Sequence, residues 1–220
     1  MNDIDTTIVM ITWSPNKKRL TVLKQCFASL KEHTKRPHIL TVVDNGPQEQ
    51  TEWLREQDID IHIVNKVNQG VGKARNQGAG VTKTKYIAFL DNDLLFFPGW
   101  LNACIGGLDK FEDLPLIATA RKTSPMKSRK FFRGQLGEYQ TWSRCAGMAL
   151  TMCRADYEFL GGWNGGSHPG GKLCDTARAH GYRFLWHPDW LARHLCKRAC
   201  YDHRKILING EWVSPQKKEK

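Results

Sequence analysis

The sequence has no apolar run that approaches the roughly 18 residues needed to cross a bilayer. Its first residues, MNDIDTT, carry acids where a secretory signal would carry positive charge. Seven cysteines, scattered from Cys26 to Cys200, are too few and too dispersed for the disulfide framework of a small secreted domain. There is also no internal repeat or low-complexity tract. These absences predict a cytoplasmic globular protein with most of its cysteines reduced and buried.

Acidic residues are in the minority, with 22 Asp and Glu against 33 Lys and Arg, and the formal charge is +11. Such an excess attracts polyanions or anionic membrane surfaces, although it does not indicate a fold. The chain has 220 residues, 40% of them hydrophobic, which suffices for one well-cored domain. We therefore expect a single domain over residues 1–212, followed by a basic tail at 213–220.

Segments with strand and helix periodicity alternate along the chain. The predicted strands are 6–13, 38–46, 59–65, 85–93, 115–120 and 147–153. The predicted helices are 19–33, 51–57, 99–110 and one that begins near Gly70. Strands that alternate with helices in this way predict an α/β fold, with a parallel sheet between helices.

Polar residues follow the first four predicted strands at the point where each one ends. They are Thr12, Asp44, Asn65, Asn68, Asp91 and Asp93. Each alone has a structural explanation, as a turn or a cap. Ligands of open parallel sheets, however, bind beyond the carboxyl ends of the strands. The joint placement of these residues therefore predicts a binding site along one rim.

The stretch KYIAFLDNDLLFFPGW places two carboxylates one residue apart after a buried strand. In an extended chain Asp91 and Asp93 point to the same side, so their oxygens lie together and would repel when unpaired. A hard divalent cation such as Mg²⁺ or Mn²⁺, held between the carboxylates and a second anion, removes that repulsion. The pattern therefore predicts a metal site that also takes an anionic ligand.

The stretch GVGKARNQG resembles two nucleotide-binding motifs without matching either. A dinucleotide fingerprint needs a third glycine where Arg75 stands, and a P-loop needs Ser or Thr where Ala74 stands. Both motifs are therefore excluded.

Four segments occur in the order and spacing of family 2 glycosyltransferases: VMITWSPNKKRLTVLKQCFASL, VVDNG, NQGVGKARNQG and IAFLDND. The resemblance covers about the first 100 residues. It implies the GT-A nucleotide-sugar-binding fold, a single domain whose mostly parallel central sheet is flanked by helices. It also implies that residues 1–100 form a nucleotide-binding half and residues 101–212 an acceptor-binding half.

The same resemblance implies roles at the donor site. Thr12 and Asp44 should lie against the nucleotide base, and Arg75 beside the base or the phosphates. Asp91 should reach the ribose side and Asp93 the metal, while both aspartates are candidate ligands. The implied cofactor is Mn²⁺ or Mg²⁺, and the implied donor is a nucleotide sugar, with a UDP-sugar favoured. The side-chain types agree, since a carboxylate accepts from an imide and a guanidinium donates to phosphate.

Past residue 140 the match continues with gaps, in CAGMALTMCRADYEFLGGWNGG. Asn164 and Gly165 stand where the family has acids, and the later Glu-Asp pair that carries its catalytic base is missing. Asp175 is the nearest acid, and we assign it as the base of an inverting transfer, in which it takes the proton of the acceptor hydroxyl. A surface pairing on an exposed helix is the alternative. His168 is the reserve base.

A histidine after the last core strand often completes the metal site of the family. His194 is favoured by its position over His187 and His203. A competing interpretation joins His194 to Cys196, Cys200 and His203, which recur on one helical face, as a structural zinc cluster. Sulfur ligands suit zinc and not the Mn²⁺ or Mg²⁺ of a donor site.

Residues 121–133 are the candidate acceptor-binding segment. They contain six Lys and Arg, no acid and the pair Phe131-Phe132. Basic residues interleaved with aromatic ones suit nucleic acid, and equally an anionic bilayer surface. Two acceptors follow: a hydroxymethylated pyrimidine in DNA, as in phage-type DNA modification, and a lipid-linked or other cell-envelope glycan. The DNA acceptor is slightly favoured, which would place a viral enzyme in the host cytoplasm.

Two further classes compete with a glycosyltransferase. One is a non-catalytic, basic nucleic-acid-binding protein with a structural zinc cluster, which has no reason to keep Asp91 and Asp93 beside Asp44 and Arg75. The other is a sugar nucleotidyltransferase. That class is disfavoured because the first strand is followed by WSPNKKR and not by a glycine-rich triphosphate loop.

Overall fold

The computed structural model describes residues 4–14, 16–46, 49–120, 131–145, 147–163, 169–189, 191–195, 206–208 and 211–213. Its elements in chain order are β1 (Thr6–Thr12), α1 (Lys17–His33), β2 (Ile39–Asp44), α2 (Glu49–Arg55), β3 (Ile61–Val64), α3 (Val71–Gly80), β4 (Tyr86–Asp91), β5 (Leu94–Phe96), α4 (Trp100–Lys110), β6 (Leu116–Thr119), β7 (Phe132–Leu136), β8 (Tyr139–Trp142), β9 (Ala149–Cys153), α5 (Arg154–Phe159), α6 (Pro169–Ala179), β10 (Arg183–Trp186), β11 (Ala192–His194), β12 (Ile206–Ile208) and β13 (Glu211–Val213).

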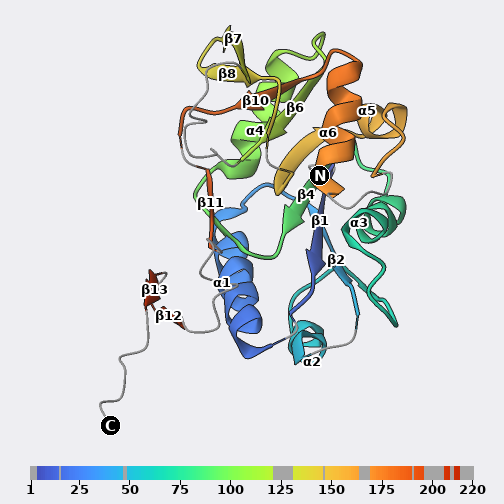
Figure 1. Ribbon diagram of the computed structural model, residues 1–220, viewed down its shortest axis with the longest axis vertical. Coiled ribbons are helices and arrows are strands. Elements are labelled where there is room, and N and C mark those ends of the chain that lie inside the picture. The colour runs from blue at the N-terminus through green and yellow to red at the C-terminus, as the bar shows by residue number, and fades with distance from the viewer. Residues whose placement is uncertain are drawn as a thin grey trace.

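A nine-stranded sheet forms the centre of the fold, in the order β3-β2-β1-β4-β9-β6-β10-β8-β7 (Figure 1). The first four strands in that order are parallel. β9 runs antiparallel to both β4 and β6, while β10 is parallel to β6. The carboxyl ends of β4, β6 and β10 therefore share one edge of the sheet, and β9 begins at that edge. The predicted α/β architecture is confirmed, with a parallel first half and a mixed second half.

Helices cover both faces of this sheet, because the buried strands are apolar on both sides. On one face, Ile8 and Met10 of β1 belong to a core that includes residues of α1 and α4. On the other face, Val9 of β1 belongs to a core with residues of α3, α5 and α6. Figure 1 shows α1 on the side of the sheet away from α3 and α6. In the described ranges, no helix is long and apolar enough to span a membrane.

Two small antiparallel pairs lie outside the main sheet, β5 with β11 and β12 with β13. At its far end the main sheet finishes with the hairpin of β7 and β8, whose register shifts between Phe132 and Gly134. The cysteines in the described part are all free, and three of these five are buried. That agrees with the expectation of reduced, buried thiols.

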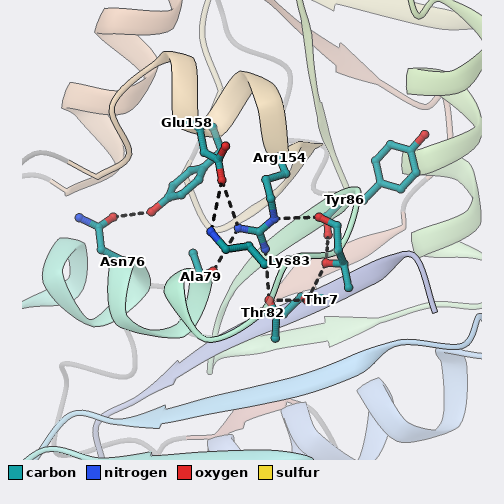
Figure 2. A network of polar contacts seen from close by, with 10 residues as sticks. Thr7, Asn76, Ala79, Thr82, Lys83, Tyr86, Arg154 and Glu158 are labelled. Carbon is teal, nitrogen blue, oxygen red and sulfur yellow. Dashed lines mark hydrogen bonds and ion pairs between the residues drawn. The ribbon is translucent and has the colours of Figure 1, made fainter. Parts of the chain in front are cut away.

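A partly buried arginine lies at the edge of the sheet opposite the predicted rim, in a network of polar contacts (Figure 2). Arg154, at the start of α5, donates from Nε to the carbonyl oxygen of Thr84 at 2.8 Å. Its Nη1 donates to the carbonyl of Ala79, and its Nη2 to Oγ1 of Thr82, both at 3.2 Å. Glu158 lies 3.8 Å from Nη1. Every guanidinium nitrogen of Arg154 is thus bonded within the protein, as expected for a structural role.

Helix α3 packs closely on the sheet at Gly78. A Cβ atom at this position would lie 2.4 Å from Cγ1 of Val9 and 3.1 Å from Cγ2 of Val43. Both valines are fully buried on β1 and β2, so neither can move aside cheaply. Glycine is therefore required here by the approach of the helix to the strands.

We expect Gly78→Ala to lower the free energy of unfolding by about 1–3 kcal/mol, because overpacked cores must shift backbone or rotamers. Gly80→Ala is the matched control on the same helix, since nothing lies within 4 Å of its Cβ position. That variant should be neutral or more stable by up to about 1 kcal/mol. Urea denaturation of both variants measures the difference, and equal midpoints would contradict the packing argument.

Candidate active site

The polar residues predicted to share a rim do lie at the ends of neighbouring strands. Thr12 at the end of β1 is in register with Asp44 at the end of β2. Asp91 at the end of β4 is in register with Ile11 on the other side of β1. Three strand ends thus place a hydroxyl and two carboxylates along one edge, as expected for parallel strands.

The buried side chain of Arg75, on α3, contacts Asp91 at the end of β4. Its Nη2 donates to Oδ1 of Asp91 at 2.6 Å and to the carbonyl oxygen of Gly147 at 2.8 Å. The guanidinium carbon lies 4.0 Å from the ring centroid of Trp163, a cation–π contact. Desolvation raises the pKa of Asp91, and the neighbouring Asp93 raises it further, while Arg75 opposes both. The arginine therefore fixes the orientation of the first carboxylate of the pair.

Arg75 still has hydrogen-bonding capacity left over. It is only 2% exposed, yet no partner for its Nε or Nη1 is found in the described part of the chain. Arg154 at the opposite edge has all of its nitrogens bonded. Because buried donors are normally satisfied, these two nitrogens are suited to a ligand with acceptor oxygens.

Asp93, directly after β4, contacts side chains of two other elements, α1 and β11. Its Oδ2 is 3.1 Å from Nε2 of His194 and 3.4 Å from Nη1 of Arg19. The pairing of β5 with β11 brings His194 opposite Leu94, directly after Asp93. The other oxygen, Oδ1, is buried without a hydrogen-bond partner among the described residues, and Asp93 as a whole is 8% exposed. A carboxylate oxygen in that position is suited to a cation.

The aspartates and His194 do not form a closed metal site by themselves. Within the ranges described, no three His, Cys, Asp or Glu side chains are placed to hold one metal ion. Asp91 turns to Arg75, while Asp93 contacts His194. A Mg²⁺ or Mn²⁺ ion commonly takes one or two protein carboxylates and completes its shell with substrate phosphates and water. The free Oδ1 of Asp93 fits a cation held in that manner.

Both carboxylate oxygens of Asp44 already accept hydrogen bonds from protein side chains. It is fully buried, with Oδ1 accepting from Nε2 of Gln50 at 2.7 Å and Oδ2 accepting from Oγ1 of Thr51. Gln50 also donates to the carbonyl of Gly46. Thr12, opposite Asp44, is equally buried, and no partner of its Oγ1 is found among the residues described. The assigned contacts of Thr12 and Asp44 with a nucleotide base stay predictions.

The asparagines after β3 hold the chain that leads into α3. Asn68 accepts from Nδ2 of Asn45 at 3.0 Å and from the backbone N–H of Gly70 at 2.8 Å. Asn65 donates to Asn45 and exchanges hydrogen bonds with Gln77 of α3. These contacts fix the start of the helix that carries Arg75. The side chains of Asn65 and Asn68 thus have structural partners.

Asp175 lies on the exposed face of α6. Its side chain is 61% exposed, and Oδ1 is 3.0 Å from Nη2 of Arg178, one turn later. This is the surface pairing that the sequence left open, and no described contact joins Asp175 to Asp91 or Asp93. The assignment of Asp175 as the base stays a prediction. The reserve base His168 and the alternative zinc ligands Cys196, Cys200 and His203 lie outside the described residues.

Sequence patterns did not indicate several residues of this site. Arg19 approaches Asp93 from α1, and Trp163 contacts Arg75 from the segment after α5. Gln50 and Thr51 bind Asp44 from α2. Each of these contacts joins two different elements of the fold, so no periodicity within one element marks it. The only available signal was the cationic start of α1, Lys17-Lys18-Arg19.

Comparison with known proteins defines the class of this chain. The model of glycosyl transferase family 2 matches residues 8–158, so the chain belongs to that family. No curated protein matches it. Among solved structures, the fold is similar to one described as "GalNAc-T7 with UDP, GalNAc and Mn2+", with a TM-score of 0.65 at 15% sequence identity. The alignment covers 87% of this chain and 43% of the other, so this chain spans less than half of that protein. The GT-A fold is confirmed.

The pairing of Asp175 with Arg178 allows a matched test of the base assignment. We expect Asp175→Asn to slow release of UDP from a UDP-sugar about 100-fold or more, because a general base acts in the transition state. Arg178→Gln breaks the same ion pair but keeps the carboxylate, and it should retain most of the turnover. Nearly normal rates in Asp175→Asn, or equal losses in both variants, would leave Asp175 with a structural role alone.

Proposed function

We propose that this protein is a metal-dependent glycosyltransferase that moves a sugar from a nucleotide-sugar donor to a hydroxyl acceptor. One observation carries the proposal: in a chain of glycosyl transferase family 2, the carboxyl edge of β4 gathers Asp91, Asp93, His194 and Arg75. Among the residues described, buried atoms of Asp93 and Arg75 have no hydrogen-bond partner. A binding module without chemistry has no need of a carboxylate that is buried and left without a partner on one oxygen.

A diphosphate and a divalent cation match these unbonded atoms in charge and type. The free nitrogens of Arg75 suit phosphate or base oxygens, and the free Oδ1 of Asp93 suits Mn²⁺ or Mg²⁺. The similar solved structure is described with UDP and Mn²⁺, which supports these two as first probes. A UDP-sugar is therefore the favoured donor.

We assign each of the candidate residues a separate role in an inverting transfer. Asp93 and His194 would hold the cation, which when bound neutralises charge that develops on the departing diphosphate. Arg75 would donate to the nucleotide while it keeps Asp91 oriented. Thr12 and Asp44 would lie on the base side. Asp175, with His168 as reserve, would take the proton from the acceptor hydroxyl.

We favour DNA as the acceptor, in the form of a hydroxymethylated pyrimidine. Phe132, the first residue of the edge strand β7, is 38% exposed and meets Trp142 edge-on at 5.3 Å between ring centroids. The Arg144 guanidinium lies 4.9 Å from the centroid of Phe131. An exposed ring near a second, half-buried ring that faces a cation suits an unstacked base and its phosphates. A base must leave the duplex to reach a pocket. The net charge of +11 supports the same class. A lipid-linked or envelope glycan is the second candidate.

The donor assignment predicts metal-dependent nucleotide binding. With Mn²⁺ or Mg²⁺, calorimetry should show UDP bound at least about tenfold more tightly than in excess chelator, because the cation joins the diphosphate to Asp93. Asp93→Asn should abolish that difference, together with hydrolysis of the donor. Asp58→Asn, which removes an equally negative but exposed side chain, is the control and should bind as the unchanged protein does. Equal UDP affinity with and without chelator in the unchanged protein would contradict the metal role.

The acceptor assignment predicts where a labelled sugar goes. DNA binding should weaken steeply with salt, and replacing Lys127, Arg129 and Lys130 together should flatten the slope by about one unit per lost phosphate contact. Because anionic vesicles can produce a similar salt effect, transfer decides. Radiolabelled sugar should enter hydroxymethylcytosine or hydroxymethyluracil DNA and not unmodified DNA. Label confined to a lipid extract would exclude DNA and favour the envelope-glycan acceptor.

A further inference from the structure

Arg19 places a cation beside the candidate metal ligand. It lies in the first turn of α1, where the side chain of Asn16 caps the helix by accepting from the Arg19 backbone N–H at 3.0 Å. The Arg19 side chain is 15% exposed, and its Nη1 is 3.4 Å from Oδ2 of Asp93. His194 meets the same oxygen from the other side. One oxygen of Asp93 is thus shared by two side chains, while Oδ1 is buried without a partner in the described ranges.

The first turn of α1 is unusual for a helix, since it contains Lys17, Lys18 and Arg19 and no acid. The N-terminal end of a helix carries a partial positive charge, so cations there are unfavourable for the helix itself. Helix stability therefore does not explain Arg19. Arg19 instead contacts Asp93, which follows β4 and lies 74 residues away in the sequence.

A cation on Asp93 would change what Arg19 can do. A divalent ion and a guanidinium within a few ångströms repel each other and compete for the same carboxylate. The diphosphate of a nucleotide sugar, which carries two negative charges, reverses this balance, because it attracts both cations. Arg19 would then oppose binding of the metal alone and favour binding of the metal together with the diphosphate.

We propose that Arg19 is an exchangeable counter-ion of Asp93, which it holds when the metal is absent and leaves for the donor diphosphate when the metal binds. The proposal rests on the donor site described above and adds Arg19 to it as a residue that contacts the donor diphosphate. Its consequence is that the protein does not retain a free cation strongly, and that metal and donor bind together.

The test measures two affinities of the full chain by calorimetry, Mn²⁺ alone and UDP at saturating Mn²⁺. In Arg19→Gln, we expect Mn²⁺ alone to bind about threefold to tenfold more tightly, because a competing cation is gone. UDP with Mn²⁺ should bind about tenfold more weakly, because a charge-assisted contact is lost. Lys17→Gln removes the same charge from the same turn at an exposed position, so neither affinity should change more than about twofold.

Opposite shifts in the two affinities are the signature of exchange, and a purely structural role would not produce them. Unchanged affinities in Arg19→Gln, or shifts in the same direction, would overturn the proposal. Arg19→Lys restores the charge and should return both affinities toward those of the unchanged protein. If thermal unfolding shows Arg19→Gln to be unfolded, Arg19→Met, which keeps the apolar stem, takes its place. Failure of the unchanged protein to bind UDP with Mn²⁺ would instead overturn the donor assignment itself.

Discussion

The ion pair between Arg75 and Asp91 holds together the parts of the protein that form the candidate site. Arg75 comes from α3, Asp91 from β4, Gly147 from the segment before β9, and Trp163 from the segment after α5. A buried ion pair contributes little net stability, because desolvation offsets the attraction of the charges. It does fix geometry, since removing Asp91 would leave the buried guanidinium of Arg75 without its charge partner. The pair therefore matters for where Asp91 and α3 lie more than for how firmly the chain folds.

The sequence predicted the first half of the fold closely, for a physical reason. Strands such as β1 and β4 are buried on both faces, so they are continuously apolar and easily recognised. Because these strands are parallel, their carboxyl ends share one edge of the sheet. The predicted position of Thr12, Asp44 and Asp91 along that edge is confirmed. His194 was chosen by its position after the last core strand. The strands that bring it to Asp93, β5 and β11, have three residues each and carry no periodicity of their own.

Side-chain partners were less predictable than positions along strands. The spacing of Asp44 said nothing of Gln50 and Thr51, which occupy both of its oxygens. Asp175 was assigned as a base because it was the nearest acid in the chain, yet its partner Arg178 lies beside it on the exposed face of α6. Hydrogen bonds between elements depend on how helices settle on the sheet, and that follows from packing such as the contact of Gly78 with Val9. Local sequence does not encode it.

The edge strand β7 affects whether two copies of the protein can associate in concentrated solution. β7 ends the nine-stranded sheet, so its outer side offers backbone N–H and C=O groups that could pair with a strand of another copy. The register shift between Phe132 and Gly134 interrupts the regular spacing of those groups, and Gly134 has a φ of 131° that no regular strand contains. A neighbouring strand would meet a bent edge with Arg133 beside the bend. The irregularity thus discourages sheets of two copies from joining end to end into a fibre.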